Sequence, residues 1–175
     1  MPELFASVLS LDSNDHKRLR IYDLYSIHKA VYGCFEDVRT ETQKIDSISS
    51  GLCWADLGGD IRSRKIIILS DRAPVNDEVR GYGEINSKKI PDTFLHSTRY
   101  RLKTRINPTK RDNQSRKLIA LRDYAEISSW FETRVEKWGF KIISQVEVGV
   151  VQTHKFKKAG KQVTLVTGDI DCVIE

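Results

Sequence analysis

The chain has 175 residues, of which 39% are hydrophobic and 30% charged, which is typical of a globular protein and excludes collagen-like and low-complexity classes. No apolar run reaches the roughly 18 residues of a membrane span, and the N-terminus lacks a signal-peptide pattern, so we expect no membrane partner. Residues 1–98 carry 13 Lys and Arg against 15 Asp and Glu, whereas residues 99–175 carry 16 against 9. An anionic partner such as nucleic acid and a merely solubilising basic surface both explain this segregation.

The three cysteines, Cys34, Cys53 and Cys172, are widely spaced and form neither a CxxC pair nor a cluster with histidine. They predict reduced thiols in a cytoplasmic protein. The histidines show no spacing typical of a metal site, so we expect no metal and no other cofactor.

The first half begins with a predicted strand at residues 4–11, a polar loop at 12–20 and a helix at 22–35. Residues 36–50 are polar and rich in Ser and Thr, which predicts a surface loop.

Further along, residues 52–57 predict a short strand, and residues 65–70, with four consecutive Ile and Leu, predict the most clearly buried strand. A short helix is an option for residues 71–82. Residues 94–106 are expected to be extended, with Pro108 ending that segment.

The second half predicts a helix at about 117–138, closed by Gly139, which is a residue type that favours helix C-termini. Residues 140–151 and 162–174 are β-rich, with a basic turn at 155–161 between them.

This order of elements predicts an α+β fold of two related halves, with domains at residues 1–97 and 98–175. The second half stops before the fourth strand and second helix that a ferredoxin-like half needs, so it is expected to be truncated. An unfinished sheet would leave an edge unpaired and favour self-association or capture of another chain's segment. The apolar residues expected near that edge are Val163, Leu165, Ile170 and Ile174.

The helix at 22–35 carries the most informative motif. At about 100° per residue, Tyr25, His28, Lys29 and Tyr32 fall within one narrow stripe, opposite an apolar stripe that would pack on a sheet. A histidine that titrates near neutral pH beside a phenol and an ammonium can transfer protons at a phosphodiester. An ordinary amphipathic surface explains the same pattern.

Basic residues alternate strictly along the next motif, at positions 99, 101, 103 and 105. On a strand they would project from one face about 6.6–6.8 Å apart, with Tyr100 on the opposite, core-facing side. Counted through Arg122, nine cations stand against one acid, Asp112. This ratio favours a phosphate-binding track over a solvated sheet face.

Four lysines lie within residues 155–161. They predict either an ordinary solvent-exposed hairpin or a basic finger that clamps an RNA backbone.

Taken together, these motifs resemble the CasE family of CRISPR RNA endoribonucleases, the pre-crRNA processing subunits of type I-E systems in the RAMP superfamily. The resemblance covers essentially the whole chain. It rests on Asp-Leu-Tyr-Ser-Ile-His-Lys at 23–29, Tyr-Arg-Leu at 100–102 running into Asn-Pro-Thr-Lys at 107–110, the junction from Trp130 to Trp138-Gly139-Phe140, and Val-Thr-Gly-Asp-Ile at 166–170.

The resemblance implies two ferredoxin-like (RRM-like) βαββαβ domains in tandem. It implies metal-independent cleavage of pre-crRNA beside a repeat stem-loop, with His28 and Tyr25 as the catalytic pair. Partners would be CRISPR repeat RNA and other subunits of a type I-E surveillance complex. The residues expected to bind RNA are Lys29, Arg99, Arg101, Lys103, Arg105, Asn107, Lys110, Arg111, Lys155, Lys157, Lys158 and Lys161.

One departure from the family pattern is the C-terminal glycine-rich loop with a lysine, followed by a final apolar strand, which this sequence does not contain. The alternative to an enzyme is therefore a non-catalytic RNA-binding module of the same fold. A scaffold that binds only proteins fits the charge segregation less well.

Overall fold

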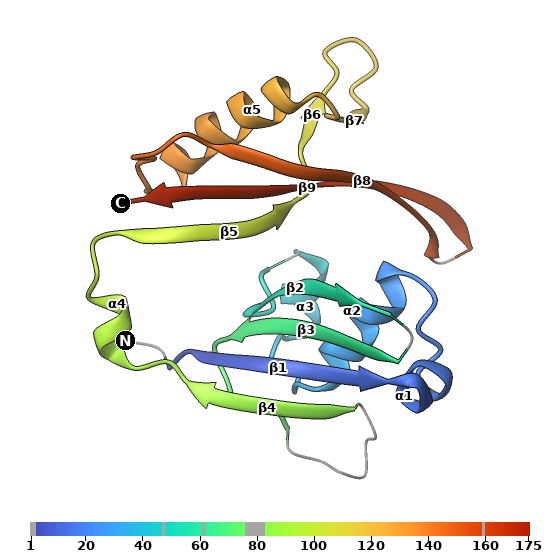
Figure 1. The fold of residues 1–175 in the computed structure, drawn as a ribbon. Helices are drawn as coiled ribbons and strands as arrows, with labels where there is room; N and C mark the ends of the chain where they lie inside the picture. The colour runs from blue at the N-terminus through green and yellow to red at the C-terminus, as the bar shows by residue number, and fades with distance from the viewer. Residues whose placement is uncertain (1–2, 47, 61, 76–82, 159) are drawn as a thin grey trace. The chain divides into compact units, whose positions relative to one another are not determined.

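The computed structural model divides the chain into two compact units, Met1–Phe94 and Leu95–Glu175. Each unit has a main antiparallel sheet with its longest helix packed on one face, so the protein is α+β, as predicted (Figure 1). The described residues are 3–46, 48–60, 62–75, 83–158 and 160–175.

The sheet of the first unit has the order β2-β3-β1-β4, and all its neighbouring strands are antiparallel. Because β1 and β2 both run antiparallel to β3, they are parallel to each other on either side of it, which is a split βαβ arrangement. The elements are β1 (Phe5–Asp12), α1 (Ser13–Arg18), α2 (Leu24–Gly33), α3 (Glu41–Ile45), β2 (Leu52–Gly59), β3 (Ser63–Ser70), β4 (Glu84–Lys89) and α4 (Asp92–Leu95), the last crossing into the second unit.

The core of the first unit confirms the predicted apolar stripe of α2. Ile27 and Val31 are buried and belong to the same core cluster as Leu9 of β1 and Ile66 and Ile68 of β3. Burying each of these side chains contributes about 1.5–3 kcal/mol to folding. The opposite side of α2 is thereby left for polar residues.

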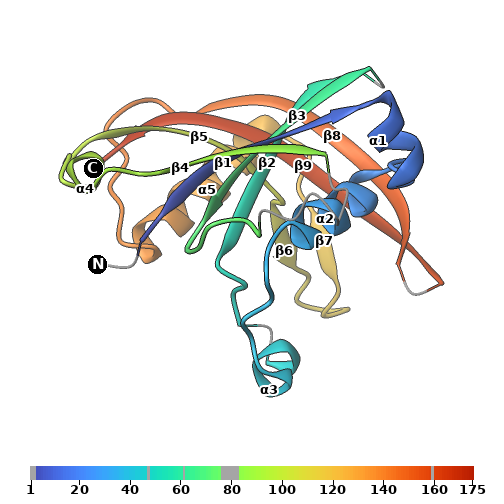
Figure 2. The same ribbon diagram turned by 90° about the horizontal axis from the view of Figure 1, so that it is seen from below.

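Two segments predicted as loops contain short helices, α1 and α3. Each begins with a capping box, in which Asp12 pairs with Asp15 and Thr40 with Gln43. Figure 2 shows α3 standing apart from the sheet of its unit, and none of its residues is buried. Local capping explains both helices, which lack the apolar periodicity used for prediction.

Strand β4 was not predicted, because its polar sequence alternates around a single apolar residue, Ile85, which packs on the core. The optional helix at 71–82 falls largely on residues 76–82, outside the described part of the chain.

The second unit has a three-stranded sheet of order β5-β9-β8 and a separate two-stranded ribbon, β6-β7. Strands β5 and β8 are both antiparallel to the central β9, which again gives a split βαβ arrangement. Helix α5 covers one face of this sheet (Figure 1). The elements are β5 (Tyr100–Ile106), β6 (Thr109–Arg111), β7 (Leu118–Ala120), α5 (Tyr124–Lys137), β8 (Glu147–Lys158) and β9 (Lys161–Ile174).

The predicted helix at 117–138 begins later than expected. Residues 118–120 pair with β6 instead, and Asp123 caps α5 by accepting hydrogen bonds from the backbone N–H groups of Ala125 and Glu126. The predicted C-terminal end is confirmed, since Trp138 is the C-cap and Gly139 has φ +85°.

The expectation that the last strand lies at an unpaired edge is wrong. Because the third strand of a split βαβ unit inserts between the first two, β9 is paired on both sides. Ile170 and Ile174 are accordingly buried, and Val163 and Leu165 are half-buried. In the described part of the second unit, the edges of this sheet are β5 and β8, and self-association through the sheet stays a prediction.

Candidate functional site

Helix α2 holds His28 and Tyr25 on its polar face. Asp23 caps the helix by accepting a 2.8 Å hydrogen bond from the backbone N–H of Ser26, whose hydroxyl accepts one from the backbone N–H of Asp23 at 3.0 Å. This capping box sets the start of the helix and hence the direction in which the next turn projects. Both His28 and Tyr25 are half-buried.

Three aromatic rings surround the imidazole of His28. The ring of Tyr25 is stacked at a centroid distance of 6.1 Å and an interplanar angle of 14°. The ring of Tyr32, one turn further along, lies 4.2 Å away, and that of Trp54 on β2 lies 6.3 Å away. The predicted pair is thus brought together, with Trp54 as a neighbour that the sequence did not reveal.

Lys29 is exposed beside this group and places its ammonium 5.3 Å from the centroid of the Tyr25 ring. This is within the range of a cation–π contact. A phosphate approaching the polar face of α2 would therefore find a cation next to the phenol.

The predicted basic strand is β5, and its cations face carboxylates across the sheet. Arg101 donates two hydrogen bonds to Asp171, at 2.9 and 2.8 Å, and Lys103 lies 3.1 Å from the same carboxylate. Arg105 binds Asp169 through hydrogen bonds of 2.6 and 3.1 Å. Just before the strand, Arg99 lies 3.3 Å from Glu175.

These ion pairs lower the pKa of Asp171 to about 2, chiefly through the hydrogen bonds from Arg101. The carboxylate is therefore charged at neutral pH and acts as a counterion to the strand. The register explains the pairing, because Lys103 lies opposite Asp171 and Arg105 opposite Asp169. As predicted, Tyr100 points the other way and packs on the core.

The remaining predicted RNA-binding residues lie on two hairpins and one loop of the second unit. Asn107 is exposed between β5 and β6, and Arg111 on β6 donates to the carbonyl oxygen of Arg116 at 2.8 Å. The basic segment at 155–161 forms the end of the β8–β9 hairpin, as predicted, but its lysines lie within the ends of β8 and β9 and not in a turn. The cations at that end of the hairpin are Lys155, Lys157, Lys158 and Lys161, all exposed.

Lys110 lies in a groove of about 640 Å³ beside α5. Its ammonium is 2.9 Å from Glu126, and the guanidinium of Arg134 stacks 4.6 Å from the centroid of the Trp130 ring. Lys137 also lines the groove. The groove combines an aromatic surface with an excess of positive charge.

Sequence analysis missed the acidic partners of β5. The signal was present, because Asp169, Asp171 and Glu175 follow the same two-residue spacing as the cations. Such alternation places the two aspartates on one face of β9, with Glu175 just after the strand.

The thiols of Cys34 and Cys172 are buried, whereas that of Cys53 is exposed, and all three are free. Burial raises the pKa of Cys34 to about 11, so this thiol is protonated and unreactive at neutral pH. Within the described ranges there is no group of three metal-ligating side chains and no helix long and apolar enough to cross a membrane.

Comparison with known proteins agrees with the resemblance predicted from the sequence. The family described as CRISPR associated protein matches residues 4–174, and the chain belongs to that family. No curated protein matches the sequence.

Solved structures give the fold. A structure of the CRISPR endoribonuclease Cse3 bound to a 19-nucleotide RNA is 17% identical, with a TM-score of 0.73 over 99% of this chain and 84% of that one. Thermus thermophilus Cse3 bound to an RNA representing a pre-cleavage complex is 20% identical, with a TM-score of 0.69 over 98% and 85%. Escherichia coli K-12 Cas6e is 16% identical, with a TM-score of 0.63 over 98% and 83%. The chain therefore has a fold like that of Cse3 and Cas6e.

Proposed function

We propose that the protein is a metal-independent endoribonuclease that binds the stem-loop of a CRISPR repeat RNA and cleaves pre-crRNA. The observation that carries the proposal is the pairing of His28 with Tyr25 on the polar face of α2, in a chain with the fold of RNA-bound Cse3. We further propose that both halves are ferredoxin-like domains, divided near residue 97, and that the protein joins other subunits of a type I-E complex.

The chemistry assigned to the site is transesterification. The ribose 2′-oxygen attacks the adjacent phosphorus, and the bond from phosphorus to the 5′-oxygen of the next nucleotide breaks. His28 donates a proton to that leaving oxygen, while Tyr25 orients the 2′-hydroxyl or helps to remove its proton. Lys29 stabilises negative charge on the phosphate. The products carry a 2′,3′-cyclic phosphate and a 5′-hydroxyl.

RNA binding is assigned to the cations of the second unit. The lysines at the end of the β8–β9 hairpin and the cations of β6 are exposed, so phosphates can approach them, although RNA must displace Glu126 to bind Lys110. The cations of β5 are already paired with carboxylates, so RNA must compete for them.

The test is cleavage of a labelled CRISPR repeat hairpin in EDTA. We expect His28→Ala to reduce the cleavage rate by about 10²–10⁴-fold while leaving RNA affinity nearly unchanged, because a general acid acts in the transition state. His96→Ala, which alters an exposed histidine outside α2, is the control and should cleave normally. If the unaltered protein binds the hairpin without cleaving it, the protein is instead a non-catalytic RNA-binding module. If His28→Ala cleaves at the normal rate, His28 is not the general acid.

A further inference from the structure

Tyr32 stands out because it links the His28 imidazole to a network of polar contacts. Its ring centroid is 4.2 Å from that of His28, the shortest of the three aromatic contacts given above. Its hydroxyl is 2.8 Å from the hydroxyl oxygen of Ser50, which lies just before β2 and is buried. Tyr32 is thus held at both ends, by an imidazole and by a buried hydroxyl.

Ser50 is itself fixed by an arginine. Its carbonyl oxygen accepts a 3.0 Å hydrogen bond from Arg72, whose Nε donates to the carbonyl oxygen of Glu36 at 2.8 Å. Asp71 holds the same guanidinium at 2.6 Å. Arg72 therefore clamps the chain just after α2 to the chain just before β2.

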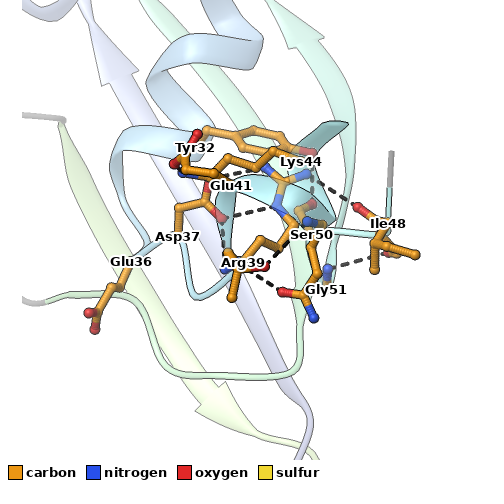
Figure 3. Close-up of polar contacts among 12 residues, drawn as sticks. Tyr32, Glu36, Asp37, Arg39, Glu41, Lys44, Ile48, Ser50 and Gly51 are labelled. Atoms are coloured by element: carbon orange, nitrogen blue, oxygen red, sulfur yellow. Dashed lines mark hydrogen bonds and ion pairs between the residues drawn. The ribbon is translucent and has the colours of Figure 1, made fainter. Parts of the chain in front are cut away.

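A second arginine holds the same approach to β2. Arg39 binds Asp37 through hydrogen bonds of 3.0 and 3.1 Å and donates to the carbonyl oxygen of Ile48 at 3.3 Å. Figure 3 shows these side chains gathered around the segment that carries Ser50. The hydrogen bonds from Arg39 lower the pKa of Asp37 to about 2, so this pair is charged at neutral pH.

We propose that Tyr32 is a positioning residue for His28, held in place by Ser50. This inference rests on the proposed function. A histidine on a helix can occupy several rotamers, and a general acid works only within hydrogen-bond reach of the leaving oxygen. The Tyr32 ring packs against one side of the imidazole and removes rotamers that would swing toward it. The bond to Ser50 keeps the ring in that place, and the two arginines keep Ser50 in place.

The experiment compares Tyr32→Leu, Tyr32→Phe, Ser50→Ala and the Tyr32→Phe/Ser50→Ala double variant. Tyr32→Leu removes the ring, and we expect single-turnover cleavage to fall about tenfold to a hundredfold, the range that a small misplacement of a catalytic group produces. Affinity for a repeat RNA with a 2′-deoxy group at the cleavage site should stay unchanged. Tyr32→Phe and Ser50→Ala each remove the same hydrogen bond, so their smaller effects should coincide, and the double variant should cost no more than either. Tyr22→Leu, on a tyrosine that is 82% exposed, is the matched control.

A second readout needs no RNA cleavage. In RNA-free protein, the imidazole proton resonances of His28 should be displaced by the neighbouring ring and should move toward ordinary values in Tyr32→Leu but not in Tyr22→Leu.

The inference is overturned if the His28 resonances and the cleavage rate are the same in all Tyr32 variants as in the unaltered protein. If the unaltered protein does not cleave, the proposed function fails, and the resonances alone decide whether Tyr32 positions His28. If Tyr32→Leu does not fold, the hydrogen-bond variants supply both readouts, and additive effects of Tyr32→Phe and Ser50→Ala would contradict the proposal.

Discussion

Removing two carboxylates from the sheet of the second unit should strengthen RNA binding. Asp169 and Asp171 neutralise Arg105, Arg101 and Lys103, which project from one face of β5. Replacing both with asparagine keeps the size of the side chains and frees the cations for phosphates. Each phosphate neutralised contributes about 0.7–0.9 to the slope of log K against log salt. Two charges therefore steepen the slope by about 1.4–1.8, which is an extra gain of about tenfold in affinity between 200 and 50 mM salt.

Fluorescence anisotropy with a labelled, uncleavable repeat hairpin, measured over a series of salt concentrations, gives the slope directly. The control is Asp46→Asn with Asp92→Asn, which makes the same change of net charge at two exposed positions, the C-cap of α3 and the first residue of α4. An unchanged slope in Asp169→Asn/Asp171→Asn, or an equal increase in the control, would refute the reasoning that RNA contacts the β5 face.

Replacing Arg101, Lys103 and Arg105 together with glutamine should weaken RNA binding and flatten its salt dependence; if neither changes, RNA binds elsewhere, with the lysine hairpin as the next candidate. Acid should destabilise the second unit as the pH falls from about 4 to about 2, because the pKa of Asp171 is lowered to about 2 in the folded protein and protonation then breaks its ion pairs. Acid unfolding followed by circular dichroism should show this loss in the unaltered protein and a smaller one in Asp171→Asn. Asp23→Ala should lower the free energy of unfolding by about 1 kcal/mol through loss of the α2 cap, measured by urea titration, and an unchanged midpoint would show that packing alone sets the helix start.

Elements with strong periodicity were predictable from the sequence. The helix at 22–35 buries the apolar stripe that its periodicity predicted. The strand at 65–70, predicted as clearly buried from four consecutive Ile and Leu, buries only Ile66 and Ile68, while Ile67 and Leu69 are exposed. The capped helices α1 and α3 were not predicted, because their stability comes from side-chain to backbone hydrogen bonds at one end and leaves no repeating apolar pattern. Strand β4 was missed for a related reason, since a solvated edge strand needs only one or two apolar contacts.

The candidate active site was predictable in part. His28 and Tyr25 are one turn apart on one helix, so local geometry fixes their proximity. Trp54 on β2 approaches His28, and Ser50, just before β2, contacts Tyr32. Only the pairing of β2 with β3 and the packing of α2 on the sheet bring these residues close. No spacing within the sequence encodes such a contact.

The basic strand shows why a count of charges along the chain misjudges a sheet. Residues 99–105 contain four cations and no acidic residue, a pattern that predicts a phosphate-binding strand. The charge on the surface of a sheet depends on the residues of neighbouring strands as well as on those of one strand. Here the neighbouring strand lies more than sixty residues further along the chain, as Arg105 and Asp169 illustrate. Their carboxylates hold the guanidinium groups in fixed positions and at the same time compete with phosphate for them. A face of this kind favours a ligand that delivers several phosphates at once, because a single phosphate gains little by displacing a carboxylate already in place. An RNA stem, with phosphates at regular spacing, meets that condition, whereas a mononucleotide does not.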